Sequence, residues 1–158
     1  MFRQATHEDL SALTDLERAA NLAALGHVFP ADRYPFPEGD VLARWALVLD
    51  EPGVTVQVLD GEPGLDAVAA FDDTTLRHLA VHPRRWGQGL ATTLVGLSLD
   101  AIAAGGATEA QLWCLEDNGR ARRLYERLGW RPADDRREAV WPPHPTEMRY
   151  TRPIAPPR

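Results

Sequence analysis

Residues 79–92 combine residue types that suit the binding of an anion. An apolar segment ending at Val81 passes through two closely spaced glycines, Gly87 and Gly89, into a second apolar segment. If that segment is a helix, the free N–H groups of its first turn point at one spot, and the glycines let a pyrophosphate approach the backbone closely. The alternative is that the glycines only shape a tight turn. A dinucleotide fingerprint does not fit, because Thr92 stands at the third glycine position and no acidic residue is suitably placed in a βαβ unit.

A second segment, residues 118–130, predicts a short amphipathic helix. Its apolar residues follow the spacing of one helical face, at Ala121, Leu124, Tyr125 and Leu128. Asn118 is a natural N-cap and Gly129 suits the position just after the helix. A buried core residue is the alternative interpretation of Tyr125, and the arginines between residues 120 and 127 are more often a solvated helix face than a binding site.

Together the two segments resemble the GNAT acetyltransferase superfamily. The family's motif has a Val-x-Pro element, here at residues 81–83, followed by Arg/Gln-x-x-Gly-x-Gly/Ala, here at residues 86–91 with Trp86 in the first position. It continues with Asn-x-x-Ala-x-x-x-Tyr-x-x-x-Gly-Phe-like residues, here from Asn118 to Trp130. The resemblance implies an α/β (α+β) fold with a mixed, mostly antiparallel central sheet of about six to seven strands flanked by about four helices. Residues 1–158 are expected to form a single acetyltransferase domain.

The resemblance also implies a co-substrate, acetyl-CoA, and a role for each motif residue. The N–H of Leu79 would stabilise the oxyanion, and Tyr125 would protonate the departing thiolate. Because Trp86 replaces the usual Arg or Gln, a side-chain contact to phosphate is not implied there, and Arg84 or Arg85 is a candidate source of positive charge. The arginines of residues 120–127 are a further candidate, for the 3′-phosphate. The expected cofactor-binding residues are Leu79, Ala80, Val81, Trp86, Gly87, Gln88, Gly89, Leu90, Ala91, Thr92 and Asn118.

The implied reaction is direct attack of a neutral amine on the thioester, which needs a group to accept the amine's proton. Five side chains near the central strands are candidates, directly or through water: His78, His82, Asp72, Asp73 and Glu116. The single cysteine, Cys114, is interpreted as a small buried residue of a strand rather than as a nucleophile.

Charge is distributed unevenly and restricts the class of protein. Residues 1–75 hold four arginines and fourteen acids, a balance of −10, whereas residues 76–158 hold thirteen arginines and nine acids, a balance of +4. The net charge of −6 argues against a nucleic-acid partner, and the absence of lysine excludes Schiff-base enzymes and phosphate-loop ATPases. One cysteine excludes a disulfide framework and multi-cysteine metal sites, and we expect no metal. No apolar run approaches a membrane span, so a cytoplasmic protein without membrane association is expected, and a homodimer is expected by analogy only.

The acidic half of the chain suggests which amine is acetylated. In this family the N-terminal helices and their loop cover the substrate side, so the sequence predicts a small cationic amine in a pocket shaped by Phe29, Tyr34, Phe36 and Trp45. A protein or peptide N-terminus is the second enzymatic possibility. A catalytically silent acyl-CoA-binding sensor is a third.

The remaining elements follow from periodicity and turn residues. Thr6 and Asp9 have the spacing of a capping box, with Asp in place of Glu or Gln, which predicts a helix that begins near His7. A further helix is predicted over residues 40–49 and another over residues 87–104. Strands are predicted at residues 2–5, 54–59, 65–71, 75–81, 110–115, 136–141 and 147–151.

Overall fold

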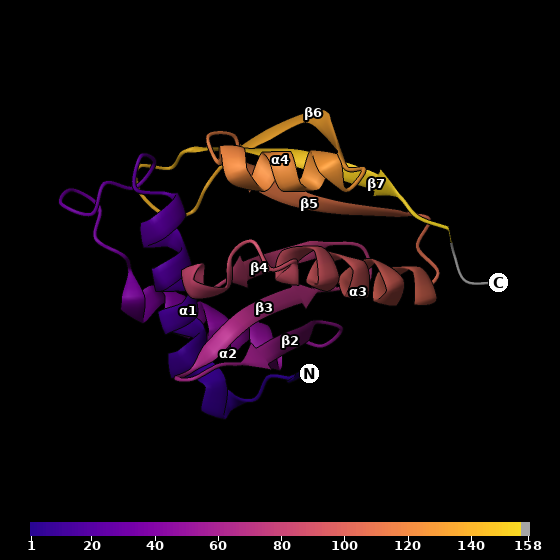
Figure 1. Ribbon diagram of the computed structural model, residues 1–158. Helices are drawn as coiled ribbons and strands as arrows, with labels where there is room; N and C mark the ends of the chain where they lie inside the picture. The colour runs from indigo at the N-terminus through magenta and orange to yellow at the C-terminus, as the bar shows by residue number, and fades with distance from the viewer. Residues whose placement is uncertain (156–158) are drawn as a thin grey trace.

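Two antiparallel sheets, lying one above the other in Figure 1, form the frame of the molecule. The computed structural model describes residues 1–155. The first sheet has the strand order β1-β2-β3-β4 and the second has the order β5-β7-β6, which confirms the expected mixed α and β fold with mostly antiparallel strands. In chain order the elements are β1 (Phe2–Gln4), α1 (Leu10–Ala24), α2 (Glu38–Asp50), β2 (Thr55–Asp60), β3 (Leu65–Phe71), β4 (Leu76–Val81), α3 (Leu90–Ala104), β5 (Glu109–Leu115), α4 (Gly119–Arg127), β6 (Arg131–Glu138) and β7 (Thr146–Pro153).

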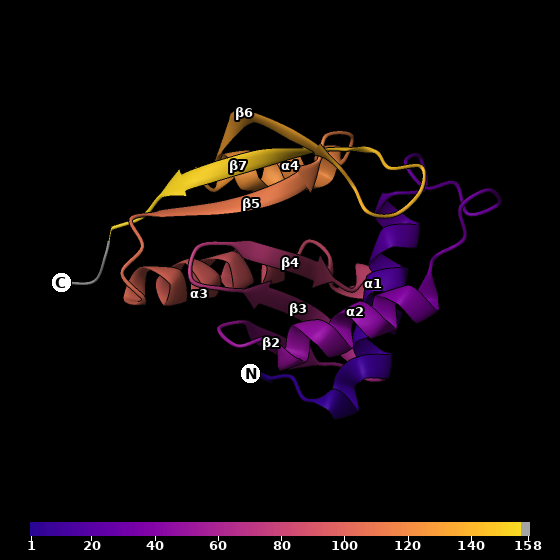
Figure 2. The same ribbon diagram turned by 180° about the vertical axis from the view of Figure 1, so that it is seen from behind.

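Helices cover both faces of the first sheet, so strand β3 is buried along its whole length. Successive side chains of a strand point to opposite faces. Val68 and Ala70 therefore pack with residues of α1 and α2, whereas Ala67 and Ala69 pack with residues of α3. Figures 1 and 2, which view the molecule from opposite sides, show α3 on one face of this sheet and α1 with α2 on the other. The two apolar layers fix the orientation of β4, the neighbour of β3.

Within residues 1–155, the backbone of one sheet is bonded to that of the other only at one end of β4 and β5. A single parallel bridge joins Thr75 to Gln111, and the N–H of Gln111 donates to the carbonyl of Thr74 at 2.9 Å. Beyond this bridge the strands diverge, and β5 pairs along its length with β7 instead. The strands expected to form one central sheet therefore form two sheets, and the edge of β4 that faces β5 has no neighbouring strand along most of its length.

Local signals place most of the element boundaries. The Thr6–Asp9 capping box is present, and the helix follows it as a short 3-10 turn that passes into α1 at Leu10. Helix α3 begins at Leu90 rather than at residue 87, because Gly87 and Gly89 adopt φ values of +78° and +80° that end the preceding turn. The predicted strand over residues 136–141 is misplaced: β6 spans Arg131–Glu138, where a largely exposed edge strand carries little apolar alternation.

No helix within residues 1–155 has the length and the apolar character needed to cross a bilayer.

Leu94 tests how strongly α3 holds the first sheet. Its side chain is fully buried in the core between α3 and the sheet, and Leu94→Ala should lower the free energy of unfolding by about 2–5 kcal/mol because it leaves a cavity. Leu47 of α2 is 73% exposed, and Leu47→Ala should change it by less than about 0.5 kcal/mol. Urea unfolding of both variants measures the difference, and equal losses would contradict the packing described for α3.

Candidate active site

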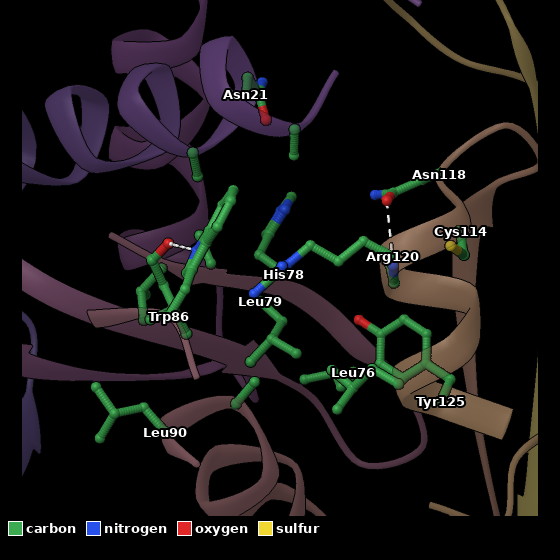
Figure 3. Close-up of a pocket in the computed structure, with 18 of the residues that line it drawn as sticks. Asn21, Leu76, His78, Leu79, Trp86, Leu90, Cys114, Asn118, Arg120 and Tyr125 are labelled. Carbon is green, nitrogen blue, oxygen red and sulfur yellow. Dashed lines mark hydrogen bonds between the residues drawn. The ribbon is translucent and has the colours of Figure 1, made fainter. Parts of the chain in front are cut away.

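A cleft of about 610 Å³ opens where β4 and β5 diverge. It is lined by β4, by the turn before α3, by α4 and by the end of β5, with α1 at its upper edge in Figure 3. All residues expected in the site line this cleft except Gln88, whose side-chain oxygen accepts a hydrogen bond from Arg85 Nε at 2.7 Å. The two motif segments are about thirty residues apart in sequence, and the fold brings them to opposite walls of one cavity. The lining residues that match the expectation are Leu79, Ala80, Val81, Trp86, Gly87, Gly89, Leu90, Ala91, Thr92, Asn118 and Tyr125.

The backbone of Leu79 faces the cleft because of the hydrogen-bond pattern between β3 and β4. His82 donates to the carbonyl of Asp66 at 2.8 Å, and the register continues with Ala80 opposite Val68. In an antiparallel pair, hydrogen-bonded and non-hydrogen-bonded pairs alternate. Leu79 lies in a non-hydrogen-bonded pair, so its N–H and C=O point away from β3, toward the open side where β5 diverges. An amide in that position can donate to an oxygen that develops negative charge in the cleft.

The amides of the turn and of the first turn of α3 are also available to a ligand. Within residues 1–155, none of the N–H groups from Gly87 to Thr92 donates to another protein atom, and the first helical bond here runs from Thr93 to the carbonyl of Gly89 at 3.0 Å. Free amides at a helix N-terminus bind phosphate groups well. The residues present therefore fit a diphosphate, which is the group expected at this turn.

The charge of the cleft also suits an anionic ligand. Two acids line it, Glu17 and Glu147, and each has an arginine partner, Arg44 and Arg137 respectively. The arginines that line it outnumber these acids, and four of them lie on the side of the turn and of α4: Arg85, Arg120, Arg123 and Arg127.

Asn118 and Tyr125 lie on α4, on the wall opposite β4. Asn118 is the N-cap, and its Oδ1 accepts a hydrogen bond from the N–H of Ala121 at 3.1 Å. Tyr125 is 8% exposed and packs edge-on against Trp130, with 6.0 Å between ring centroids. Figure 3 shows its hydroxyl pointing into the cleft. Burial raises the pKa of this phenol above its ordinary value, so it stays protonated at neutral pH and can donate a proton.

His78 lines the cleft, unlike the other four candidates for the proton acceptor. Its ring packs against Trp45, with 5.0 Å between centroids, and α1 and α2 form the wall behind it. Burial lowers the pKa of His78 well below its ordinary value, and the charges of Arg44 and Arg77 lower it further. The imidazole is therefore neutral at pH 7 with a free nitrogen lone pair, and the lowered pKa also makes it a weaker base than an ordinary histidine.

The remaining candidates have structural partners instead. His82 accepts a hydrogen bond from the N–H of Arg84 at 3.2 Å, as the cap of a short turn. Asp72 accepts from the amides of a turn and pairs with Arg77, and Glu116 lies 3.7 Å from Arg136. Asp73 is exposed and does not line the cleft. Sequence alone could not separate His78 from these residues, because the difference arises from which side chains line the cleft and which have partners elsewhere in the fold.

Cys114 also reaches the cleft, from β5, without the properties of a nucleophile. It is buried, and burial raises the pKa of its thiol to about 12. A thiol with that pKa carries almost no thiolate at neutral pH. Within residues 1–155, no group of three His, Cys, Asp or Glu side chains is arranged to hold a metal ion.

The aromatic loop lies beside the cleft rather than in it. Trp45 lines the cleft, but Phe29, Tyr34 and Phe36 line a second hollow of about 410 Å³, together with Trp141 and Asp40. Asn21 of α1 lines both cavities, which places them next to each other. Sequence analysis missed Trp141, because a lone tryptophan among prolines carries no periodic signal.

Comparison with known proteins identifies the family. Residues 15–130 match the Acetyltransferase (GNAT) family, so the chain belongs to it and is an acetyltransferase that uses acetyl-CoA as co-substrate. No curated protein sequence gives a significant match.

Solved structures share the fold at low sequence identity. The chain is similar to the PaiA N-acetyltransferase from Thermoplasma acidophilum in complex with coenzyme A, with 13% identity, coverage of 98% of each chain and a TM-score of 0.74. It is also similar to the ribosomal-protein-S18-alanine N-acetyltransferase from Escherichia coli, with 23% identity, coverage of 98% and 94%, and a TM-score of 0.73. A phosphinothricin acetyltransferase from Sinorhizobium meliloti in complex with AcCoA has 18% identity, coverage of 98% and 88%, and a TM-score of 0.69.

Proposed function

We propose that this protein transfers an acetyl group from acetyl-CoA directly to the primary amine of a small cationic molecule. The observation that carries the proposal is that one cleft collects the outward-facing N–H of Leu79, the protonated hydroxyl of Tyr125 and the neutral imidazole of His78. These are a donor for the oxyanion, an acid for the leaving group and an acceptor for the amine's proton. Such a set catalyses acyl transfer without an acyl-enzyme intermediate.

Residues of the cleft assist each step of the proposed reaction. The amine nitrogen attacks the thioester carbon, and the N–H of Leu79 donates to the oxygen that becomes negative. The attacking nitrogen becomes acidic as its bond to carbon forms, so His78 accepts its proton, directly or through water. The carbon–sulfur bond then breaks, and Tyr125 gives its proton to the departing sulfur. The proton held by His78 returns to Tyr125 through solvent, which restores both residues.

The second hollow supports a cationic acceptor that is longer than its reacting amine. Aromatic faces attract cations, and Asp40 adds a carboxylate to the same hollow. Most of the residues that line the hollow come from the acidic half of the chain, although Arg33 is among them, and the hollow adjoins the cleft at Asn21. An acceptor with its amine beside His78 and a second cationic or aromatic group in the hollow fits this arrangement. One structure with a TM-score of 0.69 to this chain is a spermidine N-acetyltransferase chimera from Vibrio cholerae and hSSAT, and spermidine is a polyamine.

An amine panel tests the proposal. The purified protein is incubated with acetyl-CoA, and free thiol release is measured with polyamines, aminoglycosides, cationic amino acids, neutral amines and a peptide with a free N-terminal alanine. We expect the largest kcat/KM for a cationic small molecule, with a KM that rises with ionic strength because salt screens charge attraction. Preference for the peptide would instead favour a protein N-terminal acetyltransferase. Binding of acetyl-CoA without thiol release for any acceptor would contradict enzymatic function.

Replacement of Tyr125 tests the leaving-group acid. Tyr125→Phe removes the hydroxyl but keeps the ring that packs against Trp130 and Tyr150. We expect kcat to fall by about 10²- to 10⁴-fold, the usual contribution of a positioned acid. The dissociation constant of acetyl-CoA, measured by calorimetry, should change less than about twofold, because the ring still fills its place. A variant that keeps the wild-type kcat would remove Tyr125 from the mechanism.

Replacement of His78 tests the proton acceptor and its pH dependence. His78→Gln keeps a polar side chain of similar size, and we expect it to lower kcat by about 10²-fold or more. Because the folded-state pKa of His78 is lowered from 6.5, its neutral form persists as pH falls through 6.5. The kcat of the wild-type enzyme should therefore show no loss from a group titrating near pH 6.5. A His78→Gln enzyme with normal turnover would argue against this role, whereas a wild-type inflection near pH 6.5 that the variant lacks would contradict the lowered pKa of His78 but not its role as proton acceptor.

A further inference from the structure

Trp86 and Arg120 meet across the cleft from its two walls. Trp86 follows the 3-10 turn of residues 83–85 and precedes the glycine turn, and Arg120 lies in the first turn of α4. The guanidinium carbon of Arg120 lies 3.9 Å from the centroid of the Trp86 ring, a close cation–π contact. The indole Nε1 of Trp86 donates to the carbonyl of Val81 at 2.8 Å, which fixes the plane of the ring (Figure 3).

The arginines next to Trp86 in sequence are already engaged by a buried acid. Asp66 is only 5% exposed, and its carboxylate pairs with both Arg84 and Arg85. Arg85 also gives its Nε–H to Gln88, and Arg84 does not line the cleft. Two of the donor groups of Arg85 are thus used inside the protein, so neither arginine can readily turn to a ligand at the glycine turn.

Arg120 is differently placed. No carboxylate among residues 1–155 lies within ion-pair distance of its guanidinium, and no hydrogen bond within that part of the chain uses its N–H groups. Stacking on an aromatic ring occupies the face of a guanidinium but leaves the N–H donors at its edge free. A planar fork of that kind matches the oxygens of a phosphate. Arg120 is therefore an exposed, uncompensated cation that stacks on Trp86 and lines the same cleft as the glycine turn and the first residues of α3.

We propose that Trp86 and Arg120 together form a side-chain site for the diphosphate of acetyl-CoA, in which Trp86 orients Arg120 and Arg120 donates hydrogen bonds to the phosphate oxygens. Trp86 itself carries no charge, so the charge is supplied from α4 rather than from residue 86. The inference deepens the proposed function, because it rests on acetyl-CoA binding along the turn. It concerns affinity for the cofactor and is independent of which amine is acetylated.

A double-mutant cycle tests the coupling of the two residues. Calorimetric titration with CoA is carried out on the wild type, Arg120→Ala, Trp86→Leu and the double variant. Arg120→Ala should weaken binding by about 10- to 100-fold, the usual effect of losing a charged hydrogen-bond donor. Trp86→Leu should weaken it by about 3- to 10-fold, and should add almost nothing once Arg120 is absent, because its effect acts through that residue. Independent, additive losses would overturn the proposed pairing.

Shortened ligands locate the contact. The weakening caused by Arg120→Ala should persist with 3′-dephospho-CoA, which keeps the diphosphate, and should disappear with pantetheine, which has no phosphate. Loss of the effect with 3′-dephospho-CoA would assign Arg120 to the 3′-phosphate and overturn the diphosphate site. An equal loss with pantetheine would mean that the substitution damages the cleft itself, and would also overturn it.

A matched variant and the wild-type titration complete the test. Arg131 is an exposed arginine of β6 that does not line the cleft, and Arg131→Ala should leave CoA affinity unchanged within about twofold. If Arg131→Ala lowered CoA affinity by a comparable factor, the effect of Arg120→Ala would be explained by the change in overall charge. That result would contradict a specific contact between Arg120 and the ligand. If the wild type itself does not bind CoA, the proposed function fails as well. If the wild type binds normally and Arg120→Ala does too, only the present inference fails.

Discussion

The divergence of β4 from β5 after a single bridge is the constraint on which the rest of the site depends. A buried backbone N–H or C=O without a partner is costly, so sheets normally pair both edges of an inner strand. Here β4 is paired with β3 on one side and leaves the other edge facing a cavity inside the molecule. The indole of Trp86 takes up the carbonyl of Val81, while the N–H of Leu79 faces the cavity. On the surface, an unpaired strand edge could pair with another chain. Here it lies where a ligand can accept or donate the hydrogen bonds that a neighbouring strand would otherwise make.

Because β4 lies between two apolar layers, its two faces are supported by different helices. Leu79 packs toward the layer that contains α3 and Tyr125, whereas His78 packs against Trp45 of α2. In the proposed reaction the thioester and the amine therefore approach from different sides and meet at the exposed edge of the strand. Only a strand whose neighbour has separated allows this, since a paired β5 would fill the space between them.

Ion pairs in the folded protein neutralise much of the uneven charge that is seen along the sequence. The acidic half of the sequence suggests a strongly negative substrate side, yet many of its acids are matched by arginines. Arg3 contacts Asp9 and Asp60, and Arg44 contacts Glu17. The lining of the cleft is consequently basic, which suits an anionic cofactor, whereas the adjoining aromatic hollow is lined by one acid, Asp40, and one arginine, Arg33.

The sequence by itself determined the features that depend on neighbours along the chain. The capping box at Thr6, the glycines before α3, the N-cap at Asn118 and the apolar stripe through Tyr125 each satisfy backbone or packing needs within a few residues, and the motif spacing is sufficient to indicate the family. Edge strand β6 was misplaced because an exposed strand needs no regular apolar alternation. Only the tertiary structure decided that the strands form two sheets, that His78 rather than four other candidates lines the cleft, and that Arg120 stacks on Trp86 while Asp66 holds Arg84 and Arg85. Those outcomes depend on burial, pKa and contacts between residues far apart in sequence, which are properties of the surroundings of a side chain and not of its type.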